Sequence, residues 1–124
     1  DIYLVNSYGE TKSFFKVCRT VFLGGSLIEH GGQNPLEAAR YGCKILHGPN
    51  VSNFQEIYSL LSQHKVSHKV SNQQEIINKV DKLFKDKSNS QNIKNKIKNL
   101  GNKILNLTSK EVNFLLIKND NKKT

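Results

Sequence analysis

The stretch TVFLGGSLIEHGGQNPLEAARYGCKILHGPNVSN, residues 20 to 53, decides the fold of this chain. An apolar run at residues 21–23 leads into two pairs of glycines and then into a predicted helix at residues 35–41, which Gly42 ends. A second apolar run at residues 44–46 precedes another glycine turn. This order of elements brings backbone N–H groups and a helix N-terminus to one point, an arrangement typical of phosphate and nucleotide sites.

The remaining sequence predicts strands and helices on both sides of this stretch. We expect a strand at residues 2–6, a helix at residues 53–63 and a last strand at residues 66–70. Two amphipathic helices follow at residues 76–84 and 93–104, separated by a turn at residues 86–91. The capping box at residues 108–111 predicts the start of a final helix.

Strands that alternate with helices predict an α/β fold with a parallel sheet. We expect a partial Rossmann-like domain of about four parallel strands flanked by helices, with a helical C-terminal end. Residues 1–118 are assigned to this domain and residues 119–124 to a disordered tail. Because crossovers between parallel strands are right-handed, the turns at residues 24–34 and 48–53 should share one edge of the sheet. That edge is the predicted ligand site.

Composition limits the kind of protein. The chain has 124 residues and no methionine, so we expect a piece of a longer protein or a processed one. Cys18 and Cys43 are expected to be reduced and buried. The four histidines show no spacing typical of a metal site, so no metal and no cofactor are predicted. No apolar run approaches the ~18 residues that span a bilayer.

Positive charge is concentrated in the last third of the chain. Residues 1–78 contain seven Lys and Arg against six Asp and Glu, whereas residues 79–124 contain twelve Lys against four acids. The excess fits either compositional drift, given fifteen Asn, seventeen Lys and ten Ile, or a surface for an anionic membrane. Nucleic acid is not expected as a partner, because few aromatic side chains or arginines accompany the lysines.

Four motifs at fixed spacings together resemble a known family. They are GGS at residues 24–26, GGQNPLE at residues 31–37, GP at residues 48–49 and NFQE at residues 53–56. With IYLVNSYGETKSFF at residues 2–15, they resemble the C-terminal domain of bacterial 3-deoxy-D-manno-octulosonic acid (Kdo) transferases, GT-B glycosyltransferases of lipopolysaccharide biosynthesis. The combination is specific, while each piece alone is weak.

The resemblance implies an enzyme that moves Kdo from CMP-Kdo onto a lipid A precursor at the cytoplasmic face of the bacterial inner membrane. The family places its catalytic base, a carboxylate, and much of its acceptor site in an N-terminal domain that this sequence does not contain. No catalytic residue is therefore assigned here. This chain is expected to bind the donor nucleotide and to be inactive alone.

Eight residues form the candidate nucleotide-binding set: Gly24, Gly25, Ser26, Gly31, Gly32, Asn34, Glu37 and Gly48. Ser26 either donates its hydroxyl to a phosphate or closes the turn. Asn34, Pro35 and Glu37 make a good helix start without any ligand. The resemblance assigns Glu37 to the ribose hydroxyls, and Asn34 to the phosphate or to the helix cap.

Some alternatives stay open. His47 lies next to the second glycine turn and is a lesser candidate for nucleotide contact, while Asn53 and Glu56 are expected to cap the following helix. A different function is a non-catalytic nucleotide-binding or interaction module whose basic end docks on an anionic membrane or RNA. Strands 1 and 2 of a Rossmann-like sheet have no counterpart in this chain. Residues 2–6 should therefore either pair beside the next strand or stay loosely ordered.

Overall fold

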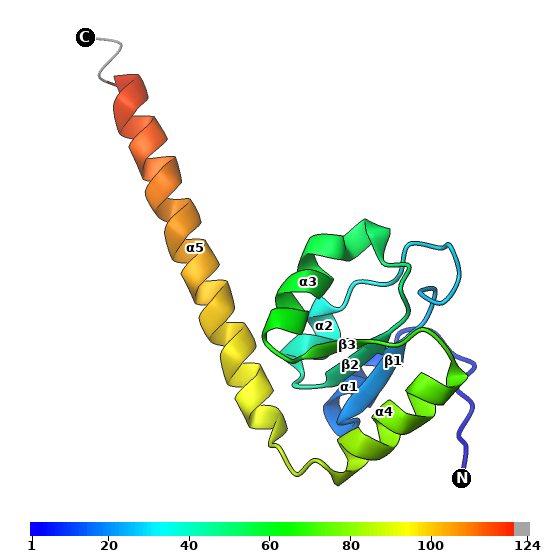
Figure 1. Cartoon of the computed structure of the whole chain (residues 1–124). Coiled ribbons are helices and arrows are strands. Elements are labelled where there is room, and N and C mark those ends of the chain that lie inside the picture. Colours follow the sequence, from blue (N-terminus) through cyan, green and yellow to red (C-terminus); the bar gives the residue numbers. More distant parts are fainter. Residues whose placement is uncertain (121–124) are drawn as a thin grey trace.

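A three-stranded parallel sheet lies at the centre of the computed structural model, which describes residues 1–120. The strands are β1 (Thr20–Leu23), β2 (Lys44–His47) and β3 (Ser67–Lys69), in the order β1-β2-β3. The helices are α1 (Thr11–Val17), α2 (Leu36–Arg40), α3 (Gln55–Gln63), α4 (Gln73–Lys85) and α5 (Ser90–Asp120), and a single 3-10 turn, η1 (Ser52–Phe54), precedes α3 (Figure 1). The predicted α/β architecture is confirmed.

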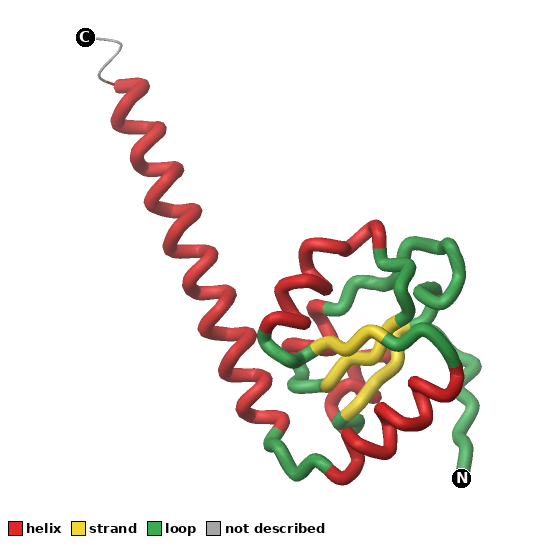
Figure 2. The backbone as a smooth tube through the Cα atoms, in the orientation of Figure 1, coloured by secondary structure: helices red, strands yellow, loops and turns green. Residues whose placement is uncertain are grey.

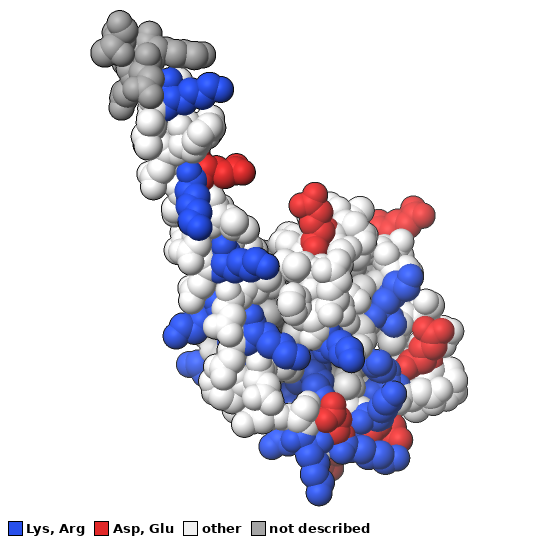
Figure 3. Space-filling model, turned by 60° about the vertical axis from the view of Figure 1, so that its left-hand side comes forward, with Lys and Arg blue, Asp and Glu red and all other residues white. Residues whose placement is uncertain are grey.

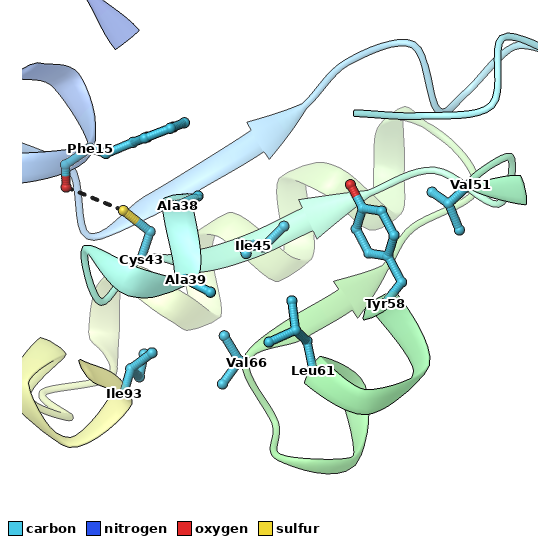
Figure 4. Close-up of a cluster of buried hydrophobic side chains, with 10 residues drawn as sticks. All are labelled: Phe15, Ala38, Ala39, Cys43, Ile45, Val51, Tyr58, Leu61, Val66 and Ile93. Atoms are coloured by element: carbon cyan, nitrogen blue, oxygen red, sulfur yellow. Dashed lines mark hydrogen bonds between the residues drawn. The ribbon is translucent and has the colours of Figure 1, made fainter. Parts of the chain in front are cut away.

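Helices cover both faces of the sheet. The central strand β2 is buried along its whole length, as expected for a strand with a neighbour on each side and helices above and below. The larger apolar cluster joins α1, α2, α3 and the start of α5 to one face, and it contains Phe15, Ala38, Ala39, Cys43, Ile45, Val51, Tyr58, Leu61, Val66 and Ile93 (Figure 4). A smaller cluster of Leu46, Val70 and Leu83 joins α4 to the other face. The sheet lies between these two layers (Figure 2).

The helix α5 starts against the end of α2 and then leaves the domain. Gly42 follows α2 with φ +83°, and a Cβ there would lie 2.5 Å from the backbone oxygen of Ser90. This close approach needs a glycine, and it places the first turns of α5 beside α2. The remainder of α5 projects from the domain (Figure 1) and leaves apolar side chains exposed: Ile104, Leu105, Leu107, Val112, Phe114, Leu115, Leu116 and Ile117.

The predicted strand at residues 2–6 does not form. These residues pair with none of the three strands, and Ile2, Tyr3 and Leu4 are exposed. A strand is stable only when neighbours bond its backbone and cover its side chains, and the described residues supply neither. The sheet within residues 1–120 therefore has three strands and not about four.

The predicted break at residues 108–111 is also wrong, because α5 runs without interruption from Ser90 to Asp120. The hydroxyl of Thr108 donates 2.9 Å to the backbone oxygen of Ile104, one turn earlier, which is the bond of a threonine inside a helix. Asn119 and Asp120 belong to α5, so they are not part of a tail. The rest of the predicted tail lies outside the described residues.

Only one of the two cysteines is buried. Cys18 is exposed and Cys43 is fully buried, and both are free thiols. The Cys43 thiol lies 3.2 Å from the backbone oxygen of Cys18, and burial raises its pKa to about 11. The expectation of two buried cysteines is thus correct for Cys43 alone. Among residues 1–120, no helix is long and apolar enough to cross a membrane.

Candidate nucleotide-binding site

The loops that follow β1 and β2 meet at the carboxyl edge of the sheet, as the sequence predicts. The fully buried hydroxyl of Ser26 donates a 2.7 Å hydrogen bond to the backbone oxygen of Leu23. It also accepts a 2.8 Å hydrogen bond from the backbone N–H of Gly48. The backbone oxygen of Ser26 accepts a further bond, 2.9 Å from the N–H of Asn50. The first loop is thereby fastened to the second.

These bonds decide between the two interpretations of Ser26. The hydroxyl has one proton, and it donates this proton in a hydrogen bond to the backbone oxygen of Leu23. The buried hydroxyl oxygen accepts a hydrogen bond from the N–H of Gly48. The side chain therefore closes the turn and has no proton left for a phosphate. Gly48 also acts within the fold, because its N–H is used and a Cβ at this position would overlap the backbone of Ser26.

The second glycine pair folds the loop back toward α3. Gly31 and Gly32 have φ +93° and +78°, a region that side chains rarely adopt. The side chain of Asn53 covers Gly31, and the backbone N–H of Asn53 donates 3.2 Å to the oxygen of Gly31. Asn53 does not cap α3: the N-cap position is Phe54, and no side chain makes a cap bond there, so that expectation is wrong. Its side chain is used instead to pack the loop.

A cavity of about 470 Å³ opens beside these loops. It is lined by Glu29, His30, Gly31, Pro49, Asn50, Val51, Ser52, Asn53 and Gln55. Within residues 1–120, no hydrogen bond uses the backbone N–H of Gly24, Gly25 or Gly31. Of these three residues only Gly31 lines the cavity, and its unused N–H group is suited to bind an anion there.

The start of α2 combines a cap with an ion pair. The side-chain oxygen of Asn34 accepts 3.0 Å from the N–H of Leu36, so Asn34 does stabilise the helix start. Glu37 is half-exposed, and its carboxylate lies 3.5 Å from the ammonium of Lys12 on α1. Neither Asn34 nor Glu37 lines the cavity. Of the eight candidate residues, only Gly31 lines it, while Ser26, Gly32 and Gly48 build the loops behind it.

Three further side chains, Tyr58, His47 and Lys12, make contacts at this edge, and of these only His47 was a candidate for nucleotide contact in the sequence. The hydroxyl of Tyr58 donates a 2.8 Å hydrogen bond to the backbone oxygen of Gln33. The ring of Tyr58 packs on the buried ring of His47, with 4.3 Å between the ring centroids. Burial raises the pKa of Tyr58 to about 12 and lowers the pKa of His47. Lys12 was missed as the partner of Glu37, because two helices far apart in sequence bring them together.

Several bacterial enzymes share part of their sequence with this chain. The 3-deoxy-D-manno-octulosonic acid transferase of Rickettsia bellii is 35% identical over 95 residues, which are 77% of this chain and 22% of that protein. The enzyme of the same name from Haemophilus influenzae is 37% identical over 60 residues, 48% of this chain and 14% of that protein. No protein-family profile matches the chain. The chain is related to the Kdo transferases.

A solved structure supports the fold. The C-terminal CMP-Kdo binding domain of WaaA from Acinetobacter baumannii superimposes with a TM-score of 0.69 at 23% sequence identity, over 78% of this chain and 51% of that one. The predicted resemblance to the C-terminal domain of Kdo transferases is thus confirmed in sequence and in architecture. The chain spans about a fifth of the length of its Rickettsia bellii relative.

Proposed function

We propose that this chain is the donor-nucleotide half of a Kdo transferase and that it holds the CMP part of CMP-Kdo at the carboxyl edge of its sheet. The observation that carries this proposal is the pair of fastened glycine loops, which leave the N–H groups of Gly24, Gly25 and Gly31 without a hydrogen bond and place Gly31 in the lining of an open cavity. The names of the relatives, and the ligand named for the Acinetobacter domain, support the choice of nucleotide.

The two loops and α2 divide the recognition of the nucleotide between them. Backbone N–H groups of the glycine loop bind the phosphate of CMP, and they stabilise its negative charge when CMP leaves the sugar. A carboxylate would repel that phosphate, so Glu37 reaches the ribose hydroxyls and accepts hydrogen bonds from them, as acidic residues do in dinucleotide folds. Asn34 keeps its role as the cap of α2.

The remaining steps belong to parts of the protein outside this chain. In the proposed reaction, a carboxylate on an N-terminal domain deprotonates the hydroxyl of the lipid A precursor, which then attacks the sugar. The reaction takes place at the cytoplasmic face of the inner membrane, where an anionic surface is a further partner for the basic C-terminal third. The chain on its own binds the donor nucleotide but does not catalyse transfer.

A titration of the isotope-labelled chain with CMP, followed by NMR, tests the proposal. We expect shifts confined to residues 24–37 and 48–53, with weak affinity because only half of the cleft is present. Residues 105–117, on the projecting part of α5, serve as the internal control. No response at saturating millimolar CMP, together with binding to anionic vesicles, would favour the non-catalytic interaction module.

A further inference from the structure

A second cavity lies on the opposite, amino edge of the sheet. We call it the amino-edge groove; it has a volume of about 770 Å³ and lies between the end of α4, the start of α5 and the turn before β3. Its charged and histidine lining consists of Lys44, His64, Lys65, His68, Lys79, Lys82, Lys85, Asp86 and Lys96. Six lysines therefore face one acidic residue. A volume of this size suits a small ligand.

Most of the positive charge in the groove is not neutralised within the protein. Lys44 pairs with Asp86 and Lys85 pairs with Asp81. The other four lysines, Lys65, Lys79, Lys82 and Lys96, form no ion pair within residues 1–120. Lysine side chains gather over the lower part of the domain, where acidic side chains lie among them, and along α5 (Figure 3). Like charges gathered around one cavity repel one another, and an anion among them relieves this repulsion.

Of the two histidines in the groove, His68 has a pKa that is lowered by burial and by the nearby positive charge. His68 lies on β3, opposite Leu46 of β2, and it is half-buried on the face that α4 covers. Burial and the nearby Lys79, Lys44, His47 and Lys82 lower the pKa of His68 to about 4. The histidine is therefore neutral at pH 7 and adds no further charge. An anion in the groove would offset the lysines and raise this pKa.

We propose that the amino-edge groove binds a phosphate group, which lysines of both α4 and α5 hold. A flexible stem of four carbons separates each lysine ammonium from its backbone, so the side chains can converge on a compact, doubly charged anion. The N-terminal turn of α5 contains no acidic residue and adds a favourable dipole. The phosphate belongs either to a soluble ligand or to a lipid headgroup. This site is independent of the proposed CMP site, which lies on the other edge of the sheet.

The test compares two variants of equal net charge. The groove variant, Lys82→Gln/Lys96→Gln, removes one exposed lysine on α4 and one on α5. The control variant, Lys103→Gln/Lys110→Gln, removes two exposed lysines of α5 outside the groove. NMR of the full chain titrated with inorganic pyrophosphate should show shifts in the groove and a higher pKa of His68. We expect the groove variant to bind pyrophosphate about tenfold more weakly, with the control unchanged.

A parallel arm uses vesicles that contain phosphatidic acid, which presents the phosphate as a headgroup. Binding of pyrophosphate with loss in the groove variant assigns a soluble ligand. Binding of the vesicles alone, lost in the groove variant and kept in the control, assigns a lipid. Circular dichroism confirms that both variants fold. Equal weakening in the two variants, or no binding in either arm, would overturn the proposal.

Discussion

The backbone N–H of Gly48 donates a 2.8 Å hydrogen bond to the hydroxyl of Ser26, and both residues are buried. Ser26 follows β1 and Gly48 follows β2, which are neighbours in the sheet. One hydroxyl thus connects the two glycine loops and also bonds back to the end of β1. The geometry of the proposed nucleotide site depends on this connection.

Removal of the Ser26 hydroxyl should destabilise the domain. Ser26→Ala leaves the buried N–H of Gly48 without an acceptor, and an unsatisfied buried donor costs about 1–3 kcal/mol. Chemical denaturation of the variant and the wild type measures the difference. Ser62→Ala, an exposed serine on α3, is the control and should change stability by less than about 0.5 kcal/mol. Equal stability of Ser26→Ala and the wild type would show that the connection contributes nothing.

Two glycines of the site should differ in their tolerance of a methyl group. A Cβ at Gly48 would overlap the backbone of Ser26, so Gly48→Ala should force the loops apart and cost about 1–3 kcal/mol. No atom lies within 4 Å of a Cβ at Gly24, so Gly24→Ala should change stability by less than about 1 kcal/mol. Thermal melts compare the two. A similar loss of stability in both variants would contradict the packing described here.

The ion pair between Lys44 and Asp86 should support stability only above the acidic range. The hydrogen bond from Lys44, whose side chain is mostly buried, lowers the pKa of Asp86 from 3.8 to about 2. The contribution is therefore complete above about pH 4 and is lost as the pH falls toward 2. Asp86→Asn should be less stable than the wild type at pH 7 and equal to it near pH 2, as measured by urea unfolding.

The control for this comparison is Asp81→Asn. Asp81 pairs with Lys85 on the exposed side of α4, where both side chains are more than half exposed. Surface pairs of this kind contribute little, so the change should be small at every pH. A pH-independent loss in Asp86→Asn would mean that its carboxylate charge is not the source of the effect.

His68 should add a second, separate window of acid sensitivity. Its pKa is lowered from 6.5 to about 4 by burial and by the lysines of the groove, so the folded state disfavours its charged form. Because the unfolded state binds a proton at His68 more readily than the folded state, the contribution of neutral His68 to the unfolding free energy is complete above pH 6.5. This contribution declines as the pH falls to about 4. His68→Gln should flatten the unfolding free energy between these values. The exposed His64→Gln is the matched control.

Local patterns in the sequence were sufficient for the core of the fold. The apolar runs at residues 21–23 and 44–46 became β1 and β2, and Gly42 ended α2 as predicted. The common edge of the two glycine turns also followed from the handedness of parallel crossovers. These features depend on short stretches of chain, where periodicity and glycine placement carry the information.

Errors arose where the outcome depends on distant contacts. The apolar residues 2–6 read as a strand, but a strand needs partners that the local sequence does not reveal. Asn53 matches a helix cap by its spacing, yet its side chain packs on Gly31. The two interpretations of Ser26 could be separated only by seeing Leu23 and Gly48 as its partners. The ion pair of Lys12 with Glu37 also joins separate helices.

The proposed contact of Glu37 with ribose is the central claim, and the affinities of CMP and 2′,3′-dideoxy-CMP test it most directly. The wild type should bind CMP roughly 10–100-fold more tightly, because a hydrogen bond to a charged acceptor contributes about 1.5–3 kcal/mol. Glu37→Gln should lose most of this discrimination, whereas Glu111→Gln, on the projecting part of α5, should keep it. Equal binding of the two nucleotides by the wild type, or full discrimination by Glu37→Gln, would contradict the account.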